Sequence, residues 1–144
     1  HEAKGFIFSK KGLGFIVDFS SLLSSTKTGK QIFELSEGDE VIGLKEINGD
    51  NVIVLSSAFK MLIFSVKELP LLKKGKGVRL QRYREETLLD ATIFSQNEKD
   101  NFIIKKIFPK HEDVSFWMGK RGLVGKMLPK KFLKKKMTKF EDLL

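Results

Sequence analysis

The most distinctive chemistry in the sequence is a run of positive charge at residues 72–84, which read LKKGKGVRLQRYR and contain no acid. Like charges this close repel one another unless solvent screens them or an anion lies across them. The run therefore predicts either a solvated surface or a binding site for a polyanion. Its six cations are Lys73, Lys74, Lys76, Arg79, Arg82 and Arg84.

No catalytic group is recognisable in the sequence. The two histidines, His1 and His111, are far apart in the sequence, which argues against a metal cluster and a Ser–His pair. The segment TKTGKQ is similar to a Walker loop, but Ser24 stands where the first glycine belongs and Gln31 replaces the Ser or Thr that binds magnesium. The single tyrosine, Tyr83, is expected to point outward from a strand and offer a stacking face. We therefore expect a binding function, with no catalytic residue and no metal site.

Composition favours one folded, basic domain. The 144 residues are 41% hydrophobic and 31% charged, and the net charge of +9 favours DNA, RNA or an anionic membrane surface as partner, although many soluble domains are basic without a functional reason. Cysteine is absent, which excludes disulfides and thiolate metal sites and is compatible with the cytoplasm. No apolar run approaches the roughly 20 residues of a membrane span, so no membrane partner is expected.

The positive charge is concentrated near the C-terminal end. Residues 1–113 hold 18 basic and 16 acidic side chains, whereas residues 114–144 hold nine basic and two acidic ones. The basic character thus comes mainly from this tail and from residues 72–84.

Short apolar runs bounded by Gly, Ser, Asn and Lys indicate strands up to about residue 108. Their length of four to eight residues and their enrichment in Phe, Ile and Val favour strands over helices. The principal runs are 5–9, 14–19, 30–35, 41–47, 51–57, 61–66 and 77–83.

An internal repeat organises these runs. Residues 5–22 line up with residues 52–69 at an offset of 47, and TGKQIFEL at 28–35 lines up with KGKGVRL from Lys74 at an offset of 46. Each unit holds a hairpin, an excursion with a Gly-Lys pair, a returning strand and a fourth strand. A unit of four strands that repeats at this offset has the size of a propeller blade. We predict an all-β partial propeller of about two to three four-stranded blades, divided into 3–50 as repeat 1, 51–97 as repeat 2, and 98–144 as a divergent partial blade with a basic tail.

The tail changes character after Trp117. Pro129 is expected to open a helix with one apolar stripe among lysines. Docking of this stripe on a sheet edge, or a frayed end, is favoured over binding to a membrane or a partner. The stripe consists of Leu133, Met137, Phe140 and Leu144.

Three segments resemble one protein family: TKTGKQIFEL at 26–35, the stretch 68–94 that begins ELPLLKKGKGVRLQ, and WMGKRGLVGKMLPKKF at 117–132. Together with the repeat, they resemble the C-terminal β-pinwheel of bacterial type IIA topoisomerase A subunits, in its topoisomerase IV form. The gyrase form carries a Gln-Arg-Arg-Gly-Gly-Lys-Gly box for tight wrapping, and the nearest match here, LKKGKG, is degenerate. The resemblance therefore favours the topoisomerase IV form and disfavours active introduction of negative supercoils.

This resemblance implies a non-catalytic fragment that binds and bends duplex DNA without sequence specificity and presents it for strand passage. The catalytic residues of the ATP-dependent enzyme would lie outside this chain, so the fragment needs no cofactor, while the full enzyme uses ATP and Mg. The full-length A protein would pair with itself and with the B protein, which carries the ATPase, in the cytoplasm on the nucleoid.

The expected DNA contacts are cations beside glycines, because a glycine lets the backbone approach a phosphate and lysine adds charge without demanding a fixed geometry. The Gly-Lys loops of the two units are expected on one rim, Arg79 on the solvent face of its strand, and the tail cations in the family's terminal motif. The set is Lys27, Lys30, Lys73, Lys74, Lys76, Arg79, Arg82, Arg84, Lys120, Arg121 and Lys126.

Two other functions stay open. A protein-interaction propeller scaffold that docks a chromosome-organising partner is the main alternative. An RNA-binding module is less favoured, because the 13 phenylalanines alternate into the expected core and Tyr83 is the residue that looks free to stack.

Overall fold

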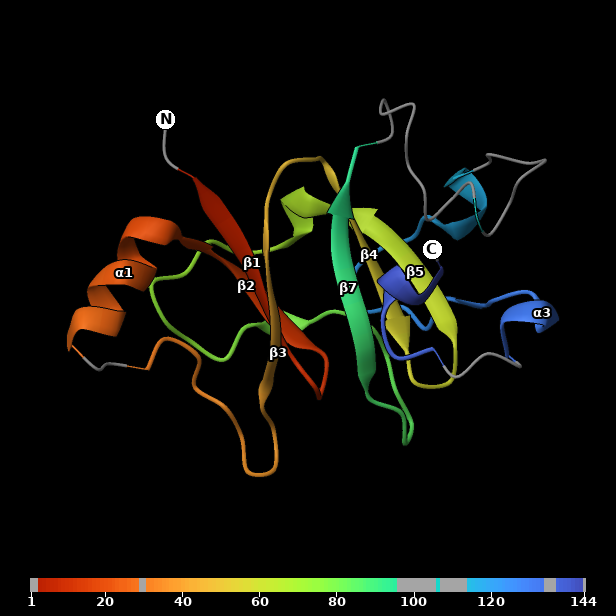
Figure 1. The fold of residues 1–144 in the computed structure, drawn as a ribbon, viewed down its shortest axis with the longest axis horizontal. Helices are drawn as coiled ribbons and strands as arrows, with labels where there is room; N and C mark the ends of the chain where they lie inside the picture. The colour runs from red at the N-terminus through yellow and green to blue at the C-terminus, as the bar shows by residue number, and fades with distance from the viewer. Residues whose placement is uncertain (1–2, 29–30, 96–105, 107–113, 134–136, 144) are drawn as a thin grey trace.

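The computed structural model describes residues 3–28, 31–95, 106, 114–133 and 137–143, with only the backbone course for 24–28 and 143. Its strands form two antiparallel four-stranded sheets, in the orders β3-β1-β2-β6 and β7-β4-β5-β8. Figure 1 shows the first sheet beside α1 and the second sheet beside the C-terminal end. The predicted all-β fold is confirmed.

The strands of the second sheet repeat those of the first at the predicted offset. The first sheet contains β1 (Lys4–Ser9), β2 (Leu13–Asp18) and β3 (Val41–Glu46). The second contains β4 (Asn51–Ser56), β5 (Lys60–Ser65) and β7 (Leu88–Phe94), each of which begins 47 residues after its counterpart. The hairpin turns also correspond, because Gly12 (φ 86) and its counterpart Phe59 (φ 60) both have a positive φ.

The fourth strand of each sheet comes from the next unit along the chain. β6 (Val78–Arg79) pairs with β2, and β8 (Lys126–Met127) pairs with β5. The sequence analysis expected each unit to hold its own four strands, and that expectation is wrong. The first sheet thus crosses the predicted boundary between residues 50 and 51, and the second sheet crosses the one between 97 and 98. The division of the chain into 3–50, 51–97 and 98–144 stays a prediction.

The apolar side chains form three layers. The central layer lies between the sheets, where Phe6 and Phe8 of β1 meet Val54 of β4 and Phe64 of β5. A second layer lies on the outer face of the first sheet, and a third lies between the second sheet and the C-terminal segments. Both faces of the two hairpins are therefore covered, and for this reason their strands read as nearly continuous apolar runs.

The sequence missed a helix, α1 (Phe19–Thr28). Its serines and threonines are weak helix formers, so propensity did not predict it, and packing of Leu22 on the outer layer supports it instead. Two expected strands are also largely absent from the described chain. In residues 31–35 only Phe33 makes a bridge, to Gly75, and in residues 77–83 the strand β6 has two residues.

The remaining helices are short: η1 (Val66–Glu68), η2 (Val114–Trp117), α3 (Lys130–Leu133) and η3 (Phe140–Leu143). Within the described ranges, no helix is long and apolar enough to cross a membrane. The apolar run expected to begin a third unit, residues 101–108, lies almost entirely outside the described residues.

The single apolar stripe expected in the tail is wrong. Leu133 is exposed, and Phe132 beside it is buried instead. Met137 and Phe140 do pack on the second sheet, but from a turn and from η3. Leu144 lies outside the described residues. The tail therefore docks through two short helical turns rather than one continuous helix.

A buried carboxylate receives this tail. Asp90 of β7 is 8% exposed, and its Oδ2 accepts the backbone N–H of Phe140 at 2.8 Å. Burial raises the pKa of Asp90 above its ordinary value, and the negative charge of Glu141 adds to the rise. The N–H groups of Phe140 and Ala91 and the charge of Lys45 lower this pKa, but by less.

This raised pKa predicts a pH-dependent stability. A group whose pKa is higher in the folded state stabilises the fold below the unfolded-state pKa, and that contribution is lost as the pH rises through the folded-state pKa. We expect the Tm of the wild type, relative to Asp90→Asn, to fall from about pH 4 toward neutrality. Thermal unfolding of both proteins across this range measures the difference, and a difference independent of pH contradicts the prediction.

Candidate nucleic-acid interface

The Gly-Lys loop of the second unit, residues 72–77, lies against the edge of the first sheet. Leu72 N–H donates to the carbonyl of Ile16 at 2.9 Å, and Gly77 (φ 76) sits so close to Gly14 that a Cβ on it would lie 2.7 Å from the Gly14 oxygen. The loop is thus fixed at both ends while its middle reaches solvent. Its exposed cations are Lys73, Lys74 and Lys76.

The same loop contacts the equivalent segment of the first unit. Glu34 N–H donates to the Gly75 carbonyl at 2.8 Å, and Gly75 N–H donates to the Ile32 carbonyl at 3.0 Å. Lys74 Nζ lies 3.8 Å from Glu34 Oε1, with side chains 70% and 46% exposed. Such an exposed pair contributes about 0–1 kcal/mol, so a phosphate can compete for the lysine.

Two of the predicted cations, Lys27 and Lys30, belong to the first unit. The side chain of Lys27 and all of Lys30 lie outside the described residues. Their expected place on the same rim stays a prediction, supported by the contact between residues 32–34 and Gly75.

The tail motif is a third copy of this loop, which the sequence analysis assigned only to the family's ending. The bridge between Ile63 and Met118 is the counterpart, 47 residues on, of the bridge between Ile16 and Leu71. Gly125 (φ 84) approaches Met61 as Gly77 approaches Gly14. The sequence does contain a signal for this third copy: GKGVRL at 75–80 aligns with GLVGKML at 122–128 when one inserted residue is allowed.

The third loop lies beside the segment that follows the second loop, although the two are 40 or more residues apart in the sequence. Gly122 N–H donates to the Leu80 carbonyl at 2.9 Å, and Arg82 N–H donates to the Leu123 carbonyl at 3.0 Å. The third loop therefore lies beside the segment that carries Arg79 and Arg82, and we call the exposed cations of these neighbouring segments the basic strip. It consists of Lys73, Lys74, Lys76, Arg79, Arg82 and Lys120.

Arg121 is half-buried and makes hydrogen bonds within the fold. Its Nη1 donates to the Arg79 carbonyl at 2.7 Å, its Nε to the Glu68 carbonyl at 2.9 Å, and its backbone N–H to Glu68 Oε1 at 3.0 Å. The guanidinium thus ties the loop at 119–122 to η1 and to β6. Its charge adds to the field of the strip, but its Nε and Nη1 donate within the fold.

We predict that Arg121→Lys lowers the free energy of unfolding by about 1–2 kcal/mol, because a lysine keeps the charge but cannot donate to both carbonyls in one plane. Urea denaturation measures the change. The exposed neighbour Lys120 is the control, and Lys120→Ala is expected to change stability by less than about 0.5 kcal/mol. Equal effects of the two substitutions would contradict a structural role for Arg121.

Two further predicted cations lie beside competing groups. Lys126 Nζ donates to the Phe116 carbonyl at 2.7 Å and sits 3.7 Å from the centre of the Phe116 ring. Arg84 is exposed, but it shares a groove with Glu85 and Glu86, whose charges weaken its attraction for phosphate. We therefore place both outside the basic strip.

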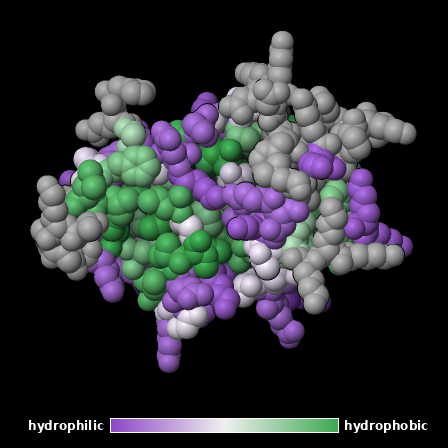
Figure 2. All heavy atoms as spheres, viewed as in Figure 1, coloured by the Kyte–Doolittle hydropathy of each residue, from purple (hydrophilic) through white to green (hydrophobic). Residues whose placement is uncertain are grey.

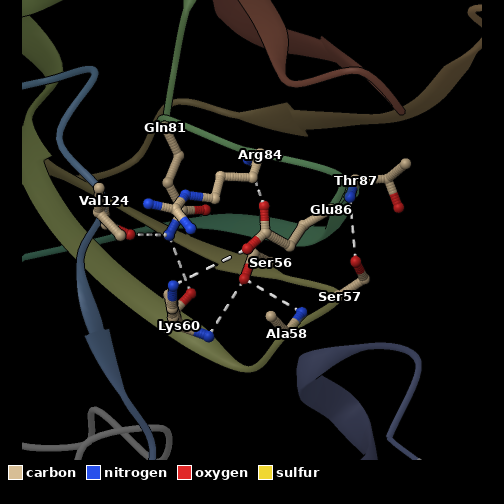
Figure 3. Close-up of polar contacts among 9 residues, drawn as sticks. All are labelled: Ser56, Ser57, Ala58, Lys60, Gln81, Arg84, Glu86, Thr87 and Val124. Carbon is tan, nitrogen blue, oxygen red and sulfur yellow. Dashed lines mark hydrogen bonds and ion pairs between the residues drawn. The ribbon is translucent and has the colours of Figure 1, made fainter.

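A polar network holds the segment that carries Gln81 and Arg84, as Figure 3 shows. Buried Gln81 donates through Nε2 to the carbonyls of Lys60 and Val124, both at 2.9 Å. Glu86 accepts the Arg84 N–H at 2.6 Å and pairs with Lys60 Nζ at 3.8 Å. Backbone N–H groups of Glu86 itself and of Arg84 hold the pKa of Glu86 below its usual value.

Tyr83 is not the stacking platform that the sequence predicted. Its side chain packs in the layer between the sheets, and a Cβ on Gly12 would run into its ring. Burial raises its pKa well above the ordinary value of 10.0, with a smaller contribution from Glu86. The expectation failed because the alternation of residues in a short strand does not reveal that the turn between β1 and β2 lies against the Tyr83 ring.

Among the residues that the structure describes, no three His, Cys, Asp or Glu side chains gather as possible metal ligands.

Comparison with known proteins agrees with this architecture. Residues 6–48 and 50–91 each match the family model described as DNA gyrase C-terminal domain, beta-propeller. The chain is 34% identical to the A subunit of DNA topoisomerase 4 from Rickettsia felis over 126 residues, which cover 88% of this chain and 17% of that protein. It is also 34% identical to the Caulobacter vibrioides protein of that name over 131 residues, or 90% and 17% of the two chains. The chain thus spans less than a fifth of these relatives.

Solved structures show the same fold. The E. coli ParC C-terminal domain matches with a TM-score of 0.72 at 23% identity, over 90% of this chain and 57% of that chain. The C-terminal domain of DNA topoisomerase IV matches with a TM-score of 0.67 at 11% identity, over 88% and 41%. With both repeats matched by the family model and with topoisomerase IV A subunits as its curated relatives, this chain belongs to the family of DNA gyrase C-terminal β-propeller domains.

Proposed function

We propose that this chain binds duplex DNA along the basic strip and bends it, as a non-catalytic part of a topoisomerase IV A subunit. The observation that carries the proposal is a pair of backbone hydrogen bonds, from Gly122 to the Leu80 carbonyl and from Arg82 to the Leu123 carbonyl, which bring the third loop beside the segment that carries Arg79 and Arg82. Lysine and arginine contacts to phosphates give affinity with little sequence specificity. Such contacts on one side of a duplex would favour bending of the DNA toward the protein when the bend brings more phosphates to the strip.

Wild-type binding as a function of salt tests this proposal. Lys74 is partly neutralised by Glu34, so we count about five phosphates for the strip and expect the logarithm of affinity to fall against the logarithm of salt concentration with a slope near −4.5. Fluorescence anisotropy of a random-sequence duplex measures the slope, and energy transfer between dyes at the duplex ends measures bending. Affinity that does not change with salt would overturn the proposal.

The wider role is also a proposal, because the chain covers 17% of its relatives' length. In it, the bound duplex is presented to a type II enzyme whose catalytic residues, ATP and Mg belong to other parts of the A protein or to the B protein, which carries the ATPase. The A protein would pair with itself and with the B protein, on the nucleoid in the cytoplasm.

One observation favours the alternative of a protein-docking surface. Leu123, Val124 and Met127 are 51%, 38% and 51% exposed in and near the third loop, next to the strip. Exposed apolar side chains near one another are a common mark of protein partners. A partner held by this surface would bind the chain with little dependence on salt, in contrast to DNA.

A further inference from the structure

An acidic side chain, that of Glu34, is fixed beside the Gly-Lys loop of the second unit. The Glu34 N–H donates to the Gly75 carbonyl at 2.8 Å, and the Gly75 N–H donates to the Ile32 carbonyl at 3.0 Å. Between these two bonds, Phe33 is 4% exposed and packs in the outer layer of the first sheet. The backbone at Glu34 is therefore held in place, while its side chain is exposed.

The second unit has a cation at the equivalent place. Arg82 donates its N–H to the third loop as Glu34 donates its N–H to the second loop. Leu80 accepts an N–H from the third loop as Ile32 accepts one from the second loop. Arg82 and Leu80 each follow their counterpart by 48 residues. The backbone arrangement thus repeats while the side chain changes from a carboxylate to a guanidinium, so the arrangement itself does not require an acid.

Glu34 lies within ion-pair distance of the basic strip. Its Oε1 is 3.8 Å from Lys74 Nζ, and the two side chains are 46% and 70% exposed. Within the described ranges, the other five cations of the strip form no ion pair. The attraction of the strip for an anion is therefore reduced at Lys74 in particular, at a place that a phosphate can reach.

A phosphate that binds Lys74 is opposed by this carboxylate in two ways. It has to replace Glu34 as the partner of the ammonium group, and it has to lie close to a second negative charge. Both effects lower the affinity for DNA. An exposed ion pair contributes little to the stability of a fold, so stability gives little reason for an acid at this position.

We propose that Glu34 competes with DNA phosphates for Lys74 and thereby limits the affinity of the basic strip, which eases release of the duplex. The inference rests on the proposed binding of DNA. In Glu34→Gln, the amide keeps nearly the same size and the same backbone N–H but carries no charge. Lys74 then becomes available to one further phosphate.

Fluorescence anisotropy of a random-sequence duplex, titrated with Glu34→Gln at several salt concentrations, tests the proposal. One added phosphate contact makes the slope of log affinity against log salt steeper by about 0.9. It raises the affinity by up to about eightfold at about 0.1 M salt. An unchanged slope and affinity would overturn the proposal.

Glu46→Gln is the matched control, because it removes the same charge from an exposed residue. Glu46 belongs to β3, which lies at the opposite edge of the first sheet from β6. Figure 2 shows an apolar surface between α1 and β3, and we expect no added phosphate contact there. The affinity should change by less than about twofold, since salt screens distant charges.

Lys74→Ala identifies the group on which Glu34 acts. In the wild type this substitution should leave the salt slope unchanged, because the paired lysine contributes no phosphate contact. In the Glu34→Gln background it should make the slope shallower by about 0.9. Equal changes in the two backgrounds would overturn the proposal, since Glu34 would then act through its charge without involving Lys74.

The wild-type titration distinguishes failure of this inference from failure of the proposed function. Wild-type binding that does not depend on salt would overturn the proposed function and the role of Glu34 with it. Salt-dependent binding by the wild type, together with equal results for Glu34→Gln and Glu46→Gln, would overturn only the role of Glu34.

Discussion

Replacing Lys73, Lys76 and Arg79 with alanine is expected to lower the affinity for random duplex DNA by up to about 500-fold at about 0.1 M salt. The three side chains are exposed in the second loop and in β6, and no contact in the described chain neutralises them. If each binds one phosphate, their loss removes about 2.7 from the slope of log affinity against log salt. Anisotropy titrations at several salt concentrations give both quantities.

A second triple variant separates the strip from net charge. Lys4, Lys10 and Lys139 are exposed cations outside the strip, and their replacement with alanine removes the same total charge. We expect it to reduce affinity by less than about tenfold, because screening confines the field of distant charges. If both variants lost affinity equally, the net charge of the chain and not the strip would account for binding.

The pairing of β6, the strand that the second unit adds to the first sheet, with β2 is expected to depend on Gly77. Gly77→Ala forces an L side chain into a positive φ of 76 and places its Cβ 2.7 Å from the Gly14 oxygen in the neighbouring strand. The left-handed conformation costs about 1–2 kcal/mol, and the backbone contact between β2 and β6 must also give way. We expect a total loss of about 3 kcal/mol, which corresponds to a fall in Tm of about 10 °C for a domain of this size.

Gly38→Ala is the control for conformation alone. Gly38 has nearly the same φ of 77, but an added Cβ would meet only Lys11 Nζ, at 3.8 Å. We expect this variant to lose about 1 kcal/mol. Thermal unfolding by circular dichroism compares the two, and equal falls in Tm would show that the close approach of β6 to β2 contributes nothing.

The hairpins and their repeat were predictable because their signals are local. Runs such as GFIFS and NVIVLSS combine β-branched and aromatic residues between turn residues, and the structure has strands at both. The helix α1 was not predictable, because its Ser- and Thr-rich sequence has little helix propensity and Leu22 gains its packing from a sheet.

The candidate site was predictable in its charge but not in its geometry. The exposed lysines of residues 72–77 were identified from composition and glycine spacing. The hydrogen bonds from Arg121 to the carbonyls of Glu68 and Arg79 were not predictable, because those partners lie 53 and 42 residues away in the sequence. Tyr83 was misjudged for the same reason, because the group that covers it, Gly12, belongs to another hairpin.

The sequence by itself determined the strand pairs of the two hairpins, the offset of 47 residues between them and the sign of the charge along the rim. These features follow from the order and type of neighbouring residues. Only the tertiary structure decided that β6 and β8 complete sheets of preceding units, that the third loop lies beside the segment that carries Arg79 and Arg82, and that the tail covers the second sheet. Hydrogen bonds and apolar burial between distant segments decide these features. Both depend on which surfaces the rest of the folded chain removes from water, and neighbouring residues in the sequence do not reveal this.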